Sequence, residues 1–302
     1  MMATVTVLMS TYNGEKYLEE QIDSIVKQEG VNVRILVRDD GSTDGTQKIL
    51  NQFQEKGILH WYTGHNLRSA RSFLNLVSCA PMSDYYAFCD QDDVWNWDKL
   101  YRAISKLKGL KDDSKPKLYC SNYQLVDAKL ENLPDNGHIS TVTFNAALVS
   151  SCCTGCTIVF DRKLLEILKI GSPKVVVMHD DWVHKVCLAV GGTVIYDNYK
   201  SLKYRQHGAN VDGGVHNVRS KFRNIYNRIR SKDRVRSLQI REILRIYRSM
   251  MPPNHVIFAD KIATYADKNI FYRIRLAYDH EIRTPYKRLN RGYRAAIILR
   301  YY

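Results

Sequence analysis

The chain has 302 residues, 45% of them hydrophobic and 25% charged, which is typical of a globular protein with one large domain and room for an appendage. It lacks a long apolar run, a signal-peptide pattern in its opening MMATVTVLMS and a dense set of cysteines (seven in all), so we expect a cytoplasmic protein. The net charge of +14 is uneven, because residues 216–302 carry 21 basic and 6 acidic side chains whereas residues 1–215 carry 24 and 25.

Apolar strand patterns alternate with helix-period segments through the first 95 residues. We predict strands at 4–10, 31–39, 58–64 and 85–89, and helices at 15–28, 43–57 and 70–80. The first helix has a predicted apolar face that includes Ile22 and Val26. Repeated strand–helix–strand units predict a parallel sheet covered by helices, with ligands at the carboxyl ends of the strands.

The remaining chain changes character twice. Residues 96–215 contain shorter, mixed elements, and residues 216–302 contain long, basic, helix-period segments without strand patterns. We therefore predict an α/β domain over residues 1–215, divided at residue 95 into two halves, and a basic helical region over residues 216–302.

Three carboxylates, Asp90, Asp92 and Asp93, follow directly after the predicted strand at 85–89. Like charges this close repel, so either some carboxylates are protonated or a cation lies among them. Neither GxGxxG nor GxxxxGK[ST] occurs, so the usual dinucleotide and phosphate loops are absent.

Several polar segments together resemble a known family. In chain order they are STYNGEKYLEEQIDSI, VRDDGSTDGT, DQDDVW, HDDW and YRQHGANV. This order is similar to that of family 2 glycosyltransferases with the GT-A fold, and within them to bacterial rhamnosyltransferase-type enzymes. The resemblance implies a Rossmann-like, mostly parallel central sheet flanked by helices, with the basic α-helical region as a C-terminal extension. It assigns nucleotide-sugar binding to residues 1–95 and acceptor binding to residues 96–215.

The resemblance also implies the donor contacts. Ser10 and Tyr12 would contact the base, and Asp40 would accept a hydrogen bond from N3–H of uracil or thymine, as suits a group that is only an acceptor. Arg71 matches an arginine near the donor, although a solvated helix arginine is the alternative. Asp39 is expected to be structural.

The acidic cluster resembles the DxD motif of the family. Asp92 would be the direct ligand of Mg²⁺ or Mn²⁺, Asp90 would bind ribose or a metal-bound water, and Asp93 would cap the segment that follows. His207 aligns with a histidine that completes the metal shell, which indicates tolerance of Mn²⁺ because imidazole is a poor ligand for Mg²⁺; the preferred metal stays open. Arg205 is a candidate to face the departing diphosphate.

The segment HDDW is predicted to lie at a strand end that opens a helix. In the family a carboxylate at this place removes the proton of the acceptor hydroxyl, which makes Asp180 the catalytic base and puts His179 in the position of a preceding acid. The adjacent Asp181 departs from the family pattern and stays an alternative base.

The implied activity is inverting transfer of a sugar, with L-rhamnose from dTDP-rhamnose expected, to a saccharide hydroxyl of a cell-surface polysaccharide. UDP-hexoses stay open as donors, because Asp40 cannot separate uracil from thymine. Two other classes also stay open. A nucleotidyltransferase shares the sheet and acidic site but usually has a basic Gly-rich loop, and a nucleic-acid-binding protein would suit the basic tail but has no use for HDDW. We expect no nucleic-acid partner.

The basic tail contains a candidate interfacial helix. Its apolar face comprises Val218, Phe222, Ile225 and Ile229, and its basic face comprises Arg219, Arg223, Arg230 and Arg234. Such a helix is typical of proteins that bind anionic membranes, so we expect peripheral binding to the cytoplasmic face and a lipid-linked acceptor. Packing on the catalytic domain and a homo-oligomer interface stay open.

The segment CCTGC contains one CxxC pair, Cys153 and Cys156. The sequence offers no second pair or histidine at zinc spacing, so we expect buried thiols here and not a zinc site.

Overall fold

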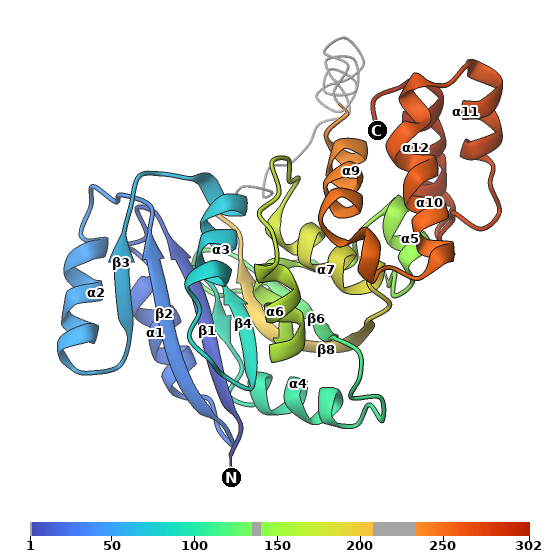
Figure 1. Cartoon of the computed structure of the whole chain (residues 1–302). Helices are drawn as coiled ribbons and strands as arrows, with labels where there is room; N and C mark the ends of the chain where they lie inside the picture. The colour runs from blue at the N-terminus through green and yellow to red at the C-terminus, as the bar shows by residue number, and fades with distance from the viewer. Residues whose placement is uncertain (1, 135–139, 208–233) are drawn as a thin grey trace.

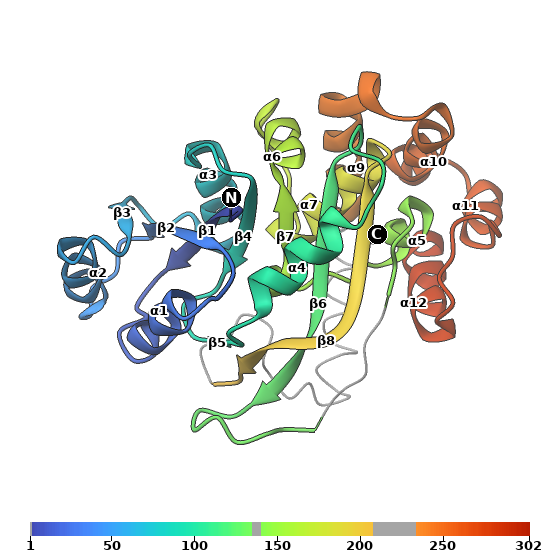
Figure 2. The same ribbon diagram turned by 90° about the horizontal axis from the view of Figure 1, so that it is seen from below.

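The computed structural model describes residues 2–134, 140–207 and 234–302. Its sheet has eight strands in the order β3-β2-β1-β4-β7-β6-β8-β5. The strands are β1 Thr4–Thr11, β2 Asn32–Asp39, β3 His60–Thr63, β4 Tyr85–Cys89, β5 Val94–Trp95, β6 Lys117–Val126, β7 Val159–Asp161 and β8 Thr193–Arg205. Strands β3, β2, β1 and β4 are mutually parallel, whereas β7 is antiparallel to both of its neighbours and β5 is antiparallel to β8. Figures 1 and 2 show this sheet with its helices on both faces.

The helices alternate with the strands in the first half and gather at the C-terminal end of the chain (Figure 1). They are α1 Leu18–Val26, α2 Thr46–Glu55, α3 Arg68–Cys79, α4 Lys99–Lys108, α5 Phe144–Val149, α6 Arg162–Lys169, α7 His179–Ala189, α9 Val235–Tyr247, α10 Pro253–Thr264, α11 Ile270–Ala277 and α12 Lys287–Ile298. The predicted α/β class, the order of the first seven elements and the helical C-terminal region are thereby confirmed.

Two local predictions are wrong. Val26 is 52% exposed although Ile22 and Ile25 are fully buried. At about 100° per residue, Val26 rotates away from the core face that Ile25 occupies. No strand precedes HDDW either, because residues 171–178 form a loop that leads directly into α7.

Alternation along β1 explains the two layers. Val5, Val7 and Met9 point into a core that also contains side chains of α1, α2 and α4. Leu8 points to the opposite face, into a second core formed with α3, α6 and α7. Both faces of β1 are therefore buried, and its functional residues lie at its carboxyl end.

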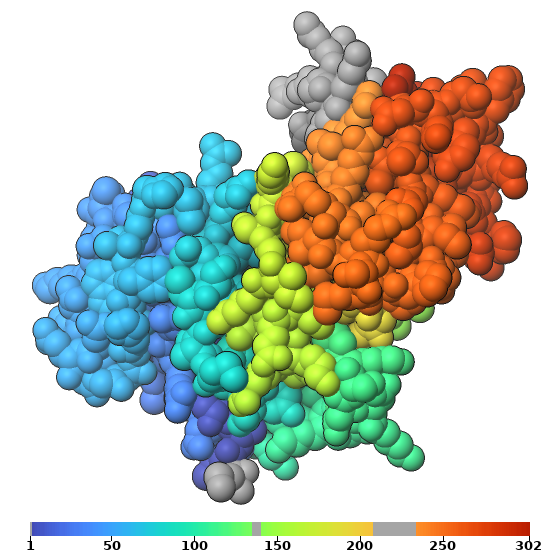
Figure 3. Space-filling model, viewed as in Figure 1, coloured from blue at the N-terminus to red at the C-terminus, as the bar shows by residue number. Residues whose placement is uncertain are grey.

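The C-terminal helices share the second core. Ile243 and Tyr247 of α9 belong to the same buried cluster as Trp182 of α7 and Leu148 of α5. Figure 3 shows the C-terminal helices as one mass against the segment that contains α6 and α7. The domain boundary near residue 216 stays a prediction.

The candidate interfacial helix of the tail cannot be compared with the structure, because residues 218–230 lie outside the described residues; Arg234 directly precedes α9. Within the described ranges, no helix combines the length and apolar character needed to cross a bilayer.

Candidate active site

A cavity of about 820 Å³ opens at the carboxyl ends of the parallel strands. Its wall includes eight of the predicted site residues, namely Ser10, Tyr12, Asp40, Arg71, Asp90, Asp92, His179 and Asp180. The structure therefore brings together side chains from the ends of β1 and β2 and the residues that follow them, from α3, from the loop after β4 and from the first turn of α7. Among the predicted residues, Asp181, Arg205 and His207 are not part of this wall.

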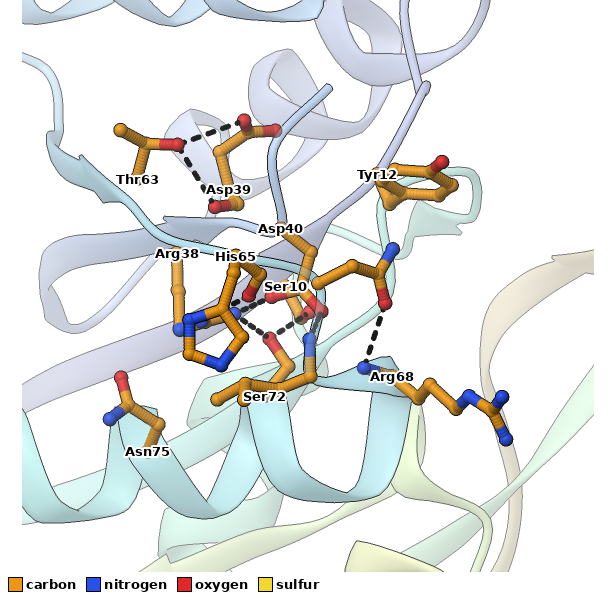
Figure 4. A network of polar contacts seen from close by, with 12 residues as sticks. Ser10, Tyr12, Arg38, Asp39, Asp40, Thr63, His65, Arg68, Ser72 and Asn75 are labelled. Carbon is orange, nitrogen blue, oxygen red and sulfur yellow. Dashed lines mark hydrogen bonds and ion pairs between the residues drawn. The ribbon is translucent and has the colours of Figure 1, made fainter. Parts of the chain in front are cut away.

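Asp40 is held in place by its neighbours (Figure 4). It forms a buried ion pair with Arg38, and its Oδ2 accepts a hydrogen bond from the backbone N–H of Leu67 at 2.9 Å. Arg38 also donates to Ser72 Oγ, which lies 2.6 Å from Ser10 Oγ. A carboxylate offers about four acceptor positions, so Asp40 retains capacity for a ligand.

The preceding Asp39 organises the turn after β2. Its carboxylate accepts hydrogen bonds from the backbone N–H and Oγ of Ser42 and from the hydroxyl of Thr11. It is fully buried and does not line the cavity, which agrees with the structural role expected for it.

The first-strand turn is linked to the acidic loop by one side chain that sequence reasoning missed. Gln91 accepts from the backbone N–H of Tyr12 at 2.8 Å and donates to its carbonyl at 3.1 Å. The Tyr12 ring remains 48% exposed at the cavity. The Q of DQDD was the available signal, but its partner 79 residues away in the chain could not be inferred.

The carboxylates of Asp90, Asp92 and Asp180 line the same cavity. Burial, followed by the neighbouring charges of Asp92 and Asp180, raises the pKa of Asp90 to about 7. Asp93 is buried beside Asp90, with carboxylate oxygens of the two residues within 4.8 Å, but it does not line the cavity; its Oδ1 accepts from the backbone N–H of Arg205 at 3.2 Å. The predicted capping role of Asp93 is therefore wrong, because a short strand follows it and α4 begins only after Asp98.

His207 and Arg205 both approach Asp92. Nε2 of His207 lies 2.7 Å from Oδ2 of Asp92, and its ring packs against Tyr17 with centroids 5.1 Å apart. Arg205 is 2% exposed and donates to the backbone carbonyls of Asp92 and Ala128 and to the carboxylate of Glu20. Facing a departing diphosphate is thus the wrong role for Arg205, since its guanidinium ties loops together behind the site.

The two adjacent aspartates of α7 have different surroundings. Asp180 lies on the cavity wall, where Oδ2 accepts from the backbone N–H of Gly155 at 3.1 Å and Oδ1 accepts from the N–H of Asp181 at 2.6 Å. Asp181 points to the C-terminal helices, with Lys185 Nζ at 2.7 Å and Gln239 Nε2 at 2.5 Å. Burial would raise the pKa of Asp181, but the Lys185 ammonium outweighs it and lowers that pKa. This geometry favours Asp180 and not Asp181 as the base.

His179 is a buried aromatic member of the wall. Its ring stacks on Phe73 at 3.9 Å and meets Phe88 edge-on at 5.0 Å. Burial lowers the pKa of His179 to about 3, and among the described residues neither ring nitrogen has a hydrogen-bond partner. A side chain at Gly155 would collide with Nε2 of His179, which explains the glycine. His179 is thus neutral and is poorly suited to the role of an acid.

Arg71 and Arg68 provide positive charge at the wall. Arg71 donates to the carbonyl of Lys174 at 2.7 Å, which leaves its remaining N–H groups at an exposed position. Arg68, which sequence reasoning missed, has a positive φ of 62° and directs its guanidinium away from the Asp40 network (Figure 4). Only its position after the short loop from β3 could have pointed to it.

The acidic side chains fit a hard divalent cation. Besides burial, the carboxylates of Asp92 and Asp180 raise the pKa of Asp90, and a dication among them would offset this repulsion. Asp92 and His207 would hold such an ion, because carboxylate oxygen suits Mg²⁺ or Mn²⁺ and imidazole adds a donor that Mn²⁺ accepts.

Solved structures with the same architecture are glycosyltransferases. The Staphylococcus aureus TarS fragment 1–349 in complex with UDP-GlcNAc matches with a TM-score of 0.60 and 16% identity, over 98% of this chain and 88% of that one. Mannosyltransferase PcManGT from Pyrobaculum calidifontis, in complex with GDP-Man and Mn²⁺, matches with a TM-score of 0.54 and 18% identity, over 99% and 86%. The chain has the GT-A fold of these enzymes.

The chain belongs to glycosyl transferase family 2, whose model matches residues 6–168. Among its relatives, dTDP-rhamnosyl transferase RfbG of Shigella flexneri is 29% identical over 72% of this chain and 78% of its own length. The Escherichia coli UDP-Glc:alpha-D-GlcNAc-diphosphoundecaprenol beta-1,3-glucosyltransferase WfgD is 30% identical over 54% of this chain and 62% of its own length. The protein is a glycosyltransferase, as the motifs predicted, and the nucleotidyltransferase and nucleic-acid-binding classes are set aside.

Proposed function

We propose that the protein is an inverting glycosyltransferase that uses a nucleoside diphosphate sugar as donor. The observation that carries this proposal is the convergence of Asp40, Asp90, Asp92 and Asp180 on one cavity from three separate segments. Ser10, Tyr12 and Asp40 would bind the base, Asp90 the ribose, and Arg71 the donor. The acceptor hydroxyl would enter beside Asp180.

The proposed proton transfer begins at Asp180. Its carboxylate is oriented by the N–H groups of Gly155 and Asp181, which fix the carboxyl plane at the cavity wall. As the acceptor oxygen bonds to the anomeric carbon, its proton passes to Asp180 and the bond from that carbon to the diphosphate oxygen breaks. A general base of this kind typically contributes about 10²- to 10⁴-fold in rate.

A bound Mg²⁺ or Mn²⁺ would stabilise negative charge on the leaving diphosphate. Asp92 and His207 are the residues proposed to hold it. PcManGT, whose structure contains Mn²⁺, supports this assignment by analogy of fold.

L-Rhamnose from dTDP-rhamnose is the proposed donor, with a cell-surface polysaccharide as product. The support is the similarity to dTDP-rhamnosyl transferase RfbG. A UDP-hexose is the second candidate, supported by the shorter match to WfgD.

Donor binding tests the proposal directly. Wild-type protein should show higher thermal stability with dTDP-rhamnose and Mn²⁺ than with either alone, and Asp92→Asn should lose the metal-dependent part of that shift. Asp180→Asn should keep the shift and lose transfer, because the base acts on the acceptor. Larger stabilisation by UDP-glucose than by dTDP-rhamnose would make a UDP-hexose the first candidate donor. The absence of stabilisation by any nucleotide sugar would contradict the proposal.

We propose that the protein docks to an anionic membrane through α11. Docking at the membrane would bring the enzyme to a lipid-linked acceptor. Phe271, Ile274 and Tyr278 are 79%, 42% and 61% exposed and recur at spacings of three and four, with the exposed Arg275 beside them. Residues 268–302 carry 9 Lys and Arg against 2 Asp and Glu. An apolar face rimmed by basic side chains is typical of interfacial helices.

A further inference from the structure

Three cysteines and one histidine from separate parts of the chain meet beside α7. Cys120 lies on β6, Cys152 and Cys153 lie in the loop after α5, and His184 lies on α7. The three sulfur atoms lie within 4.8 Å of one another, and Nε2 of His184 lies 3.8 Å from Sγ of Cys152. Cys152 is partly exposed and the other three side chains are buried.

The distances from Sγ of Cys152 to Cys153 and to His184 match those of a tetrahedral zinc site. With Zn–S near 2.3 Å and Zn–N near 2.0 Å, tetrahedral ligands lie about 3.8 Å apart for two sulfurs and about 3.6 Å apart for sulfur and nitrogen. Sγ of Cys152 lies 3.9 Å from Sγ of Cys153 and 3.8 Å from His184 Nε2. A disulfide would need sulfurs about 2.05 Å apart, and all seven cysteines, which lie within the described ranges, are free.

The surroundings of the cluster prepare it for a soft metal. Oγ of Ser151 lies 2.8 Å from Nδ1 of His184, which leaves Nε2 on the side of the sulfurs, as is usual for an oriented histidine ligand.

We propose that Cys120, Cys152, Cys153 and His184 form a binding site for a structural Zn²⁺ ion. This site is separate from the acidic cluster and differs from it chemically. Soft thiolates select Zn²⁺, whereas the carboxylates of the cavity suit Mg²⁺ or Mn²⁺.

The zinc site lies directly behind the catalytic base. The loop that carries Cys152 and Cys153 continues into Thr154 and Gly155, which line the cavity, and the N–H of Gly155 donates to Asp180. His184 follows Asp180 by four residues on α7, so both lie on the same side of the helix. Zinc would therefore fix the position of Asp180, a consequence that rests on the proposed role of that residue.

Metal analysis of the full-length protein tests the site without relying on activity. Protein purified with reductant and without chelator should contain about one equivalent of zinc per chain. Cobalt exchanged into the protein should show a thiolate-to-cobalt charge-transfer band and the visible bands of tetrahedral cobalt. Cys152→Ser and His184→Gln should each weaken zinc binding by at least about 10-fold. Cys187→Ser, a buried cysteine outside the cluster, should retain the metal.

Other outcomes would overturn the zinc site. Wild-type protein that takes up no zinc on dialysis, gives no cobalt charge-transfer band or keeps its zinc in both ligand variants contradicts the proposal. A disulfide among the three cysteines in zinc-free, reductant-free protein would assign the cluster to redox chemistry. The wild-type cobalt spectrum decides the matter even if a variant does not fold. Asp92→Asn should retain zinc, which separates failure of this site from failure of the proposed donor metal.

Discussion

Asp180 and Asp181 are neighbours in sequence with opposite environments, because successive residues of a helix point about 100° apart. Asp180 faces the cavity, and Asp181 forms an ion pair with Lys185, whose side chain is 2% exposed. The family resemblance predicted Asp180 as the base and left Asp181 as an alternative, since Lys185 and Gln239 come into contact with Asp181 only in the folded chain.

Substitution of these two residues should therefore have opposite effects. Asp181→Asn leaves the Lys185 ammonium buried without its counter-ion and should lower the free energy of unfolding by about 3 kcal/mol or more. Asp180→Asn should leave stability close to that of wild type and abolish transfer. Urea denaturation and initial rates of both variants measure the difference. If Asp181→Asn protein is stable but inactive while Asp180→Asn protein is active, Asp181 and not Asp180 is the base.

His179 predicts a pH dependence of stability. Its folded-state pKa of about 3 lies below the value of 6.5 for an unfolded histidine, so between these values the unfolded chain binds the extra proton. Its contribution is therefore fully present above pH 6.5 and lost on acidification, by about 1.4 kcal/mol per pH unit. Urea denaturation at pH 7.5 and 5.5 should show a loss in wild type that is about 1.4 kcal/mol larger than in His179→Leu.

The exposed His60 provides a control for this pH effect. His60→Gln should show the same pH dependence as wild type. An unchanged pH dependence in His179→Leu would mean that His179 is protonated in the folded protein.

At the scale of elements, α11 provides the proposed membrane surface. Phe271→Glu combined with Ile274→Glu should reduce flotation with anionic liposomes several-fold, because the charges remove apolar contact and repel the lipid headgroups. Met82→Glu, at an apolar residue that is 60% exposed in the first half of the chain, is the matched control. Equal flotation of all proteins would move any membrane contact elsewhere, including the tail residues outside the described ranges.

The elements themselves were predictable to different degrees. Strands β1, β2 and β4 are long enough and apolar enough to be recognised, and each ends directly before polar site residues. The three-residue β7 and the two-residue β5 were not predicted, because their pairing depends on β4, β6 and β8 and not on a local pattern. For the same reason the sequence could not show Cys120 and His184 beside Cys152, because the segment CCTGC was judged only from its CxxC pair, Cys153 and Cys156.

At the scale of the whole molecule, the C-terminal helices form part of the cavity wall indirectly. Gln239 donates to Asp181 and accepts from the N–H of Val177 at 2.6 Å, and Glu242 accepts from the N–H of Lys174 at 2.7 Å. Val177 and Lys174 both line the cavity. The basic region predicted from charge alone therefore has a packing role that its composition did not reveal.

Removal of this region should consequently disrupt more than membrane binding. A chain that ends at Gly214 would lack Ile240, Ile243 and Tyr247, which are buried in one core with α7 and α5. The apolar side chains of α7 and α5 in that core would then be exposed. We expect this shortened protein to lose its sharp near-UV circular dichroism and its cooperative thermal transition. Glu242→Gln, which keeps the core intact, should retain both signals. Retention of a cooperative transition by the shortened chain would show that residues 1–214 fold independently.

The first two turns of α7 have a consequence for making hybrid enzymes. Asp180 faces the cavity, Asp181 contacts α9 and His184 faces the cysteine cluster, so three neighbouring regions depend on a single stretch of seven residues. A crossover between two related transferases placed after α7 would join one parent's helix to the other parent's C-terminal helices and mismatch the Asp181–Gln239 contact. A crossover placed before β6, which begins at Lys117, would transfer the three cysteines, the wall loop, α7 and the C-terminal helices together, and is the junction at which acceptor preference should be exchangeable as a unit.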